Sequence, residues 1–193
     1  MDLTQGTLEE KNNRAKKMML WFGIVSLIMS FAGLTSAYVV SSSREDWLKD
    51  FQLPNAFAIS TIVIIISSLT FIMAKKALVS NKRQATTLWL LSTLVLGLIF
   101  IYNQFFGFNQ IIESGYNFTG PTSNITMTFI FIIAFAHIVH VIVGLISLLI
   151  VIYNHFKQKY NAKKMLGFEL AATFWHFIDF LWLYLFLFLY FFR

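Results

Sequence analysis

The order of polar and apolar positions divides this sequence into five long apolar runs separated by short, mostly charged connections. A helix that crosses about 30 Å of hydrocarbon needs roughly 20 mainly apolar residues, because each residue adds about 1.5 Å. All five runs reach that length or come close to it. We therefore predict an all-α fold, an integral membrane bundle of five transmembrane helices that forms a single membrane domain over residues 1–193. The expected helices cover residues 18–40, 54–74, 86–108, 125–153 and 167–192.

The composition agrees with a membrane protein. Hydrophobic residues make up 58% of the chain and charged residues 12%, and the mean hydropathy is +0.69, far outside the range of ordinary soluble domains. The sequence has no cysteine, which excludes disulfides, thiolate metal sites and cysteine nucleophiles. The formal charge of +6 does not indicate a nucleic-acid partner, because basic residues in a membrane protein chiefly record its topology.

The positions of the basic residues predict the orientation of the chain. Twelve of the fifteen Lys and Arg residues lie in the N-terminal arm and in the second and fourth connections, and three lie on the opposite side. Because cytoplasmic loops carry the excess of Lys and Arg, we expect a cytoplasmic N-terminus and an exterior, periplasmic C-terminus. The twelve are Lys11, Arg14, Lys16, Lys17, Lys75, Lys76, Lys82, Arg83, Lys157, Lys159, Lys163 and Lys164, and the three are Arg44, Lys49 and Arg193.

Polar side chains inside the apolar runs are concentrated in the last two predicted helices. At 100° per residue, those of the fourth helix fall within roughly 60° of arc and those of the fifth within about 120°. Each helix therefore has its polar groups on one face, and we define these residues together as the polar seam. Its members are His137, His140, Gly144, Glu169, Thr173, His176 and Asp179.

The depths of these residues can be compared by counting from the connection between the two helices. In an antiparallel pair, residues whose numbers sum to about 320 lie level, which places His140 beside Asp179 and Gly144 beside His176. A glycine opposite a larger residue lets membrane helices approach closely. An ionised Asp at mid-membrane costs on the order of 3 kcal/mol, so it normally has a partner. We therefore predict a structural role for the seam, with His140 and Asp179 in contact.

Other side chains of the fifth predicted helix have simpler interpretations. Glu169 lies near the cytoplasmic end, where it can either occupy the first helical turn, favoured by the macrodipole, or take a buried role. The aromatic residues, among them Trp175 and Trp182, are expected mostly to face lipid. Tyr190 suits an anchor at the exterior interface.

Two other functions use the same polar residues. The first is a haem-binding membrane redox protein with His137 or His140 and His176 as ligands, although a close helix contact at this depth leaves little room for a porphyrin. No Glu-x-x-His pair of the di-iron type is present. The second is a small proton-coupled transporter with Glu169, His176 and Asp179 as a relay. Transporters often have helices broken near mid-membrane, whereas both prolines of this sequence lie at the edges of the apolar runs.

Two motifs carry a resemblance to a known family. The stretch "GFELAATFWHFIDFLWLYLFLFLYFF" closely resembles the C-terminal helix of subunit III of haem-copper oxidases, and "AHIVHVIVGLI" resembles the His-x-x-His-Val-x-x-Gly-Leu segment of the preceding helix. The likeness is looser upstream. The matching positions are His137, His140, Val141, Gly144, Leu145, Gly167, Phe168, Glu169, Trp175, His176, Phe177, Ile178, Asp179, Trp182 and Leu183.

This resemblance implies a function that the residues alone do not give. The chain resembles the short, five-helix bacterial form, an accessory subunit of a proton-pumping cytochrome c oxidase in the bacterial inner (cytoplasmic) membrane. Subunit III carries no haem, copper or catalytic centre of its own, since these lie in subunits I and II. It packs against subunit I, holds phospholipid between its helices, and supports proton uptake and enzyme lifetime. A supercomplex with a quinol-oxidising complex is a further partner that the resemblance implies.

Overall fold

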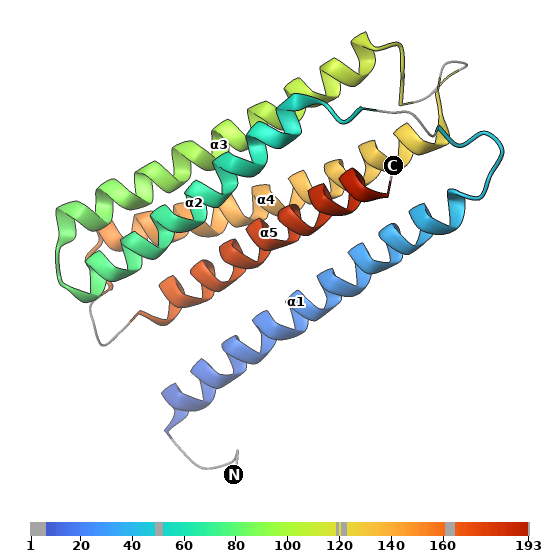
Figure 1. Cartoon of the computed structure of the whole chain (residues 1–193). Helices are drawn as coiled ribbons and strands as arrows, with labels where there is room; N and C mark the ends of the chain where they lie inside the picture. Colours follow the sequence, from blue (N-terminus) through green and yellow to red (C-terminus); the bar gives the residue numbers. More distant parts are fainter. Residues whose placement is uncertain (1–6, 49–51, 119, 121–122, 161–164, 193) are drawn as a thin grey trace.

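A computed structural model of the chain describes residues 7–48, 52–118, 120, 123–160 and 165–192. Over these residues the chain forms five α-helices, each long and apolar enough to cross a membrane, which confirms the predicted all-α bundle (Figure 1). The helices are α1 (Leu8–Ser41), α2 (Asn55–Val79), α3 (Arg83–Glu113), α4 (Ile125–Phe156) and α5 (Leu166–Phe191).

The first helix begins well before the predicted start at residue 18. Its N-terminus is fixed by a capping box, in which the Thr7 hydroxyl accepts from the Glu10 amide at 3.3 Å and the Glu10 carboxylate accepts from the Thr7 amide at 2.9 Å. Hydropathy marks only the part of a helix that lies in hydrocarbon. The polar turns before residue 18 continue the helix beyond that part.

Residues suited to left-handed backbone or to capping mark several of the other helix ends. Asn81, between α2 and α3, has a φ of 56°, and Gly115, just after α3, has a φ of 90°; Asn and Gly adopt this region most readily. Asn124 caps α4, since its side-chain oxygen accepts from the Thr126 amide at 2.8 Å.

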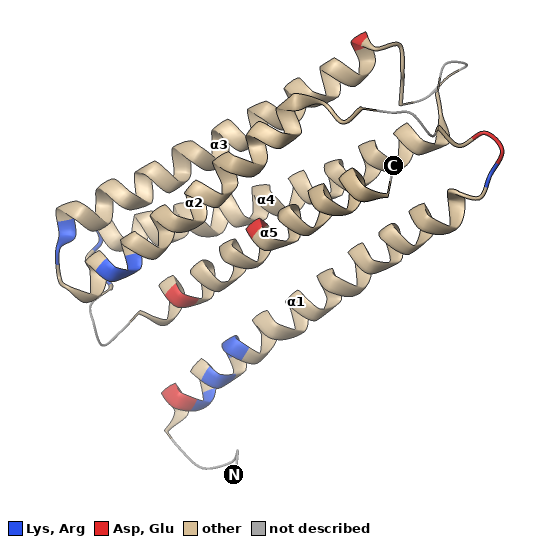
Figure 2. Cartoon of the chain, viewed as in Figure 1, with Lys and Arg blue, Asp and Glu red and all other residues tan. Residues whose placement is uncertain are grey.

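Helices α2 to α5 form a group of four, and α1 lies to one side of it (Figure 1). α2 contacts α3 and α5, α4 contacts α3 and α5, and α1 contacts α4 and α5 (Figure 1). The α1 N-terminus and the α2–α3 and α4–α5 connections lie at one end of the molecule, which carries most of the described Lys and Arg residues (Figure 2). We define this end as the basic end. Four basic residues used to predict the topology lie outside the described residues: Lys49, Lys163, Lys164 and Arg193.

At the opposite end, the connection between α1 and α2 is fastened to the start of α4. The Asn124 side-chain amide donates to the Asp46 carbonyl at 3.1 Å, and the Leu48 amide donates to the Thr126 hydroxyl at 3.1 Å. The exposed Arg44 guanidinium donates to the Asp46 carboxylate at 2.8 Å. This hydrogen bond lowers the pKa of the Asp46 carboxyl and raises the pKa of Arg44.

Candidate functional site

Several polar side chains of α5 face α2. Near the basic end, the Glu169 carboxylate lies 3.5 Å from the Lys75 ammonium, and both side chains are partly exposed. Glu169 therefore occupies the first turn of its helix, where a carboxylate is favoured. Two turns further along α5, His176 Nδ1 shares a hydrogen bond of 2.6 Å with the Ser68 hydroxyl. These contacts join α5 to α2 at two depths.

Two tryptophans of α5 make further hydrogen bonds to α2. The Trp175 indole N–H donates to the Ser67 hydroxyl at 3.2 Å, and the Trp182 indole N–H donates to the Thr61 hydroxyl at 3.0 Å. Both tryptophans are buried. The expectation that they face lipid is therefore wrong, because an indole N–H in hydrocarbon needs an acceptor and the α2 hydroxyls supply one.

Asp179 lies one turn beyond His176 on the same helix and is 6% exposed. The Ser68 hydroxyl is close enough to interact with its carboxyl group, and the same hydroxyl shares the 2.6 Å hydrogen bond with His176 Nδ1. Neither carboxyl oxygen of Asp179 has a hydrogen-bond partner in the part of the chain that the structure describes. The seam therefore contains one buried acid that lies beside Ser68 without a hydrogen bond of standard geometry.

The two histidines of α4 have other neighbours than this cluster. His137 is fully buried, and its ring centroid lies 5.0 Å from that of Trp182 and 5.8 Å from that of Phe100. Neither of its ring nitrogens has a hydrogen-bond partner among the described residues. His140 is half-buried, donates from Nδ1 to the Ala136 carbonyl at 2.6 Å, and packs against Phe31 of α1.

The predicted pairing of His140 with Asp179 is not formed as a hydrogen bond, since neither carboxyl oxygen of Asp179 has a partner among the described residues. Counting from the α4–α5 connection gives the depth of each residue but not the direction in which its side chain points. α5 packs against α1, α2 and α4, so its polar face could meet any of the three. It meets α2, where Ser68 offers a hydroxyl.

Thr173, assigned to the same face of α5, is exposed.

Gly144 is a point of close helix packing, as expected, but its neighbours are different. A Cβ placed on Gly144 would lie 3.1 Å from Ile178 and 3.2 Å from the Trp175 ring. The prediction that His176 lies opposite Gly144 is wrong by one residue, because the Trp175 ring lies against Gly144 while His176 bonds Ser68 of α2. Gly97 of α3 meets the same indole, with its Cβ position 2.9 Å from Trp175.

Sequence reasoning did not predict the hydrogen bonds that join α2 to α3, although Gln104 belongs to the looser upstream resemblance. The Gln104 amide donates to the Ser60 hydroxyl at 2.9 Å, and the Thr70 and Thr93 hydroxyls lie 2.8 Å apart. A signal was present in α2, where the pairs Ser60–Thr61 and Ser67–Ser68 recur at an interval of seven residues. That interval places both pairs on one face of the helix.

Fold and site together define a class of protein: a multi-pass helical membrane protein in which most polar side chains of the last helix bind a neighbouring helix of the same chain. Within the described residues, no group of three or more His, Cys, Asp or Glu side chains is placed to hold a metal ion. The comparison with known families is more specific. The family model described as "Cytochrome c oxidase subunit III" matches residues 5–193, and the chain belongs to this family.

Individual relatives agree with this assignment. The chain is 32% identical over 140 residues to a "Cytochrome c oxidase subunit 3" of Spodoptera frugiperda, covering 72% of this chain and 89% of that protein. It is 28% identical over 184 residues to the protein of the same name from Bacillus sp. (strain PS3), covering 93% and 86%. It is also 28% identical over 158 residues to a "Cytochrome bo(3) ubiquinol oxidase subunit 3" of Pseudomonas putida, covering 82% and 73%.

Proposed function

We propose that this chain is the accessory subunit III of a proton-pumping haem-copper oxidase that accepts electrons from cytochrome c, and that it carries no redox centre of its own. The observation that carries this proposal is the direction of the polar seam. Glu169 and His176 bind Lys75 and Ser68 of α2, so these ligand-competent groups are used to join helices. The names of the Spodoptera and Bacillus relatives support cytochrome c as electron donor.

Subunits I and II and membrane phospholipid are the proposed partners, together with a respiratory supercomplex containing a quinol-oxidising complex. The outward surface of α1 supports a partner within the membrane. This helix contacts only α4 and α5 among the described helices, and it exposes large apolar side chains along its length, including Trp21, Phe22 and Met29. Such a surface is stable against lipid or against the helices of another subunit.

The bacterial inner membrane is the proposed location, with the basic end of the molecule on the cytoplasmic side. The described Lys and Arg residues at that end support this orientation (Figure 2), since cytoplasmic segments carry the excess of basic residues. In this setting the seam supports proton uptake and enzyme lifetime indirectly, by keeping the helices of the subunit in one arrangement against subunit I.

Co-purification in mild detergent tests the proposed function. A tag on this chain is expected to recover subunits I and II, with a haem Soret band in the complex and none in the separated chain. A stoichiometric Soret band in the separated chain would favour the haem-protein alternative instead. Proton-coupled transport by the chain alone in vesicles would favour the transporter alternative.

A further inference from the structure

Asp179 is the one acidic side chain in the middle of a described helix (Figure 2). It lies at the centre of α5, far from both ends of that helix. Its side chain is 6% exposed, and neither carboxyl oxygen has a hydrogen-bond partner among the described residues. An ionised carboxylate is costly in hydrocarbon unless a cation or several donors compensate it. The neighbours of Asp179 therefore decide which form of the acid this position holds.

No lysine or arginine of the described helices lies near the centre of the bundle. α5 packs against α1, α2 and α4. α4 and α5 contain no Lys or Arg, and those of α1 and α2 lie in the turns at the basic end. On α2, Lys75 is about 10 Å along the helix axis from Ser68, and it lies 3.5 Å from the Glu169 carboxylate. Asp179 therefore has no Lys or Arg counter-ion among the described residues.

The nearest titratable group on α5 is His176, one turn away, and Ser68 of α2 links the two residues. The Ser68 hydroxyl shares the 2.6 Å hydrogen bond with His176 Nδ1 and is also close enough to interact with the Asp179 carboxyl group. The histidines of α4, His137 and His140, pack against aromatic rings instead. A hydroxyl has one hydrogen to donate and lone pairs that accept. Ser68 therefore serves both neighbours by donating to one and accepting from the other.

Two arrangements of protons obey this rule, and both contain the same number of protons. In the first, the Asp179 carboxyl donates to Ser68 Oγ and the Ser68 hydroxyl donates to His176 Nδ1, so the neutral imidazole has its proton on Nε2. In the second, the carboxyl proton has moved to Ser68 and the Ser68 proton to Nδ1, so a carboxylate faces an imidazolium. A buried ion pair is stable only with close contact and further hydrogen bonds, which Asp179 lacks. The first arrangement, which contains no charge, is therefore favoured.

We propose that Asp179, Ser68 and His176 form a binding site for one proton at the centre of the membrane, with the proton resident on Asp179. The neutral carboxyl group then acts as a donor toward α2. It adds a contact between α5 and α2 beyond the Glu169–Lys75 and His176–Ser68 pairs. The inference concerns this chain alone and does not rest on its place in an oxidase.

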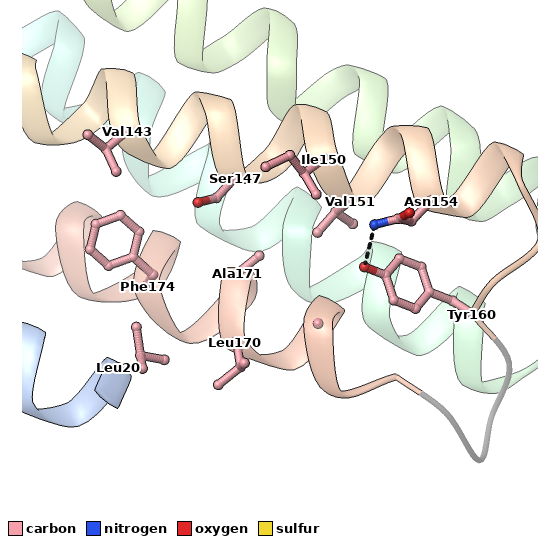
Figure 3. Close-up of a pocket in the computed structure, with 11 residues that line it drawn as sticks. Leu20, Val143, Ser147, Ile150, Val151, Asn154, Tyr160, Leu170, Ala171 and Phe174 are labelled. Atoms are coloured by element: carbon pink, nitrogen blue, oxygen red, sulfur yellow. Dashed lines mark hydrogen bonds between the residues drawn. The ribbon is translucent and has the colours of Figure 1, made fainter. Parts of the chain in front are cut away.

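The cavity on the other side of α5 does not reach this site. It is a groove of about 450 Å³ between α1, α4 and α5, with mainly apolar walls (Figure 3). Ser68, His176 and Asp179 are all absent from its lining. The groove therefore brings no water to the Asp179 carboxyl group, and the low polarity that favours the neutral acid is preserved.

Infrared spectroscopy of the full chain in lipid bilayers at about pH 7, where an Asp in water is ionised, tests the proposal. The unchanged chain is expected to show the C=O stretching band of one protonated carboxylic acid. Aspartate labelled with ¹³C at the side-chain carboxyl is expected to shift this band, and Asp179 is the only Asp within a described helix. Asp179→Asn is expected to abolish the band. The matched control Glu169→Gln removes the partly exposed acid of the same helix and is expected to leave the band unchanged.

Two further variants separate the two proton arrangements. His176→Leu is expected to keep the band, whereas an ion pair would give no band in the unchanged chain and a new band in this variant. Ser68→Ala is expected to move the band to higher frequency, because the carboxyl group loses the acceptor for its hydrogen.

A labelled, unchanged chain without the band would overturn the proposal, as would a band that survives Asp179→Asn. If a variant fails to fold, the isotope shift in the unchanged chain decides the question. Recovery of subunits I and II with the tagged chain would leave the proposed function intact in either case.

Discussion

The Trp175 indole occupies the space that a side chain on Gly97 would need, since a Cβ there would lie 2.9 Å from the ring. The same indole packs beside Gly144 of α4 and donates to Ser67 of α2. One residue of α5 therefore touches three other helices. In a membrane, where lipid competes for apolar contacts, such close packing and hydrogen bonding are the main sources of helix association.

Gly97→Ala is expected to destabilise the bundle by about 1–3 kcal/mol, the usual effect of adding a methylene to a packed core. The added carbon would also lie 2.8 Å from Leu145, so two neighbours would have to move. Unfolding in detergent by increasing denaturant measures the effect. Gly33→Ala is the matched control, because no atom lies within 4 Å of its Cβ position; a loss as large in the control would contradict the explanation.

The hydrogen bond from Trp182 to Thr61 is suited to a double-mutant cycle. Trp182→Phe removes the donor and Thr61→Val removes the acceptor, and each changes the shape of the side chain as little as the chemistry allows. The coupling energy is expected to be about 0.6 kcal/mol, typical of hydrogen bonds between membrane helices. Strictly additive losses of unfolding free energy would show that the 3.0 Å contact contributes nothing.

His137→Leu is expected to leave the stability of the chain unchanged or slightly higher. Both ring nitrogens of His137 are buried without a partner among the described residues, and replacing an unsatisfied polar group by an apolar one removes its desolvation cost. Thermal unfolding in detergent is the measurement. A loss of more than about 2 kcal/mol, the scale of a broken buried network, would show that His137 has a bonding role that this structure lacks.

The Arg44–Asp46 pair gives a prediction about pH. Because the pair lowers the pKa of Asp46 in the folded chain, its small stabilising contribution is present above the carboxyl's unfolded pKa and is lost as pH falls through the folded value. Arg44→Gln should raise the pKa of Asp46 toward that of a free Asp, as followed by NMR titration of its carboxyl carbon. An unchanged titration would mean that the 2.8 Å contact does not persist in solution.

The five helices could be predicted from the sequence, because hydropathy and rise per residue are local properties. The neighbouring helix that each polar side chain contacts could not be predicted in this way. Residue counting places His140 and Asp179 level, yet His140 packs against Phe31 of α1 and Asp179 lies near Ser68 of α2. Side-chain direction depends on which helices surround α5, and that is a tertiary property. Trp182 was misjudged for a related reason, since bulk in an apolar run does not reveal whether lipid or protein covers it.

The most direct test of the central claim, that polar residues of α5 join helices and that the histidines of α4 and α5 bind no electron carrier, is the haem content of the oxidase purified with the double variant His137→Leu/His176→Leu. The second change removes the 2.6 Å hydrogen bond to Ser68. We predict the same ratio of haem to complex as in the unchanged oxidase, with a smaller fraction of complexes retaining this chain. A fall in haem per assembled complex would contradict the account.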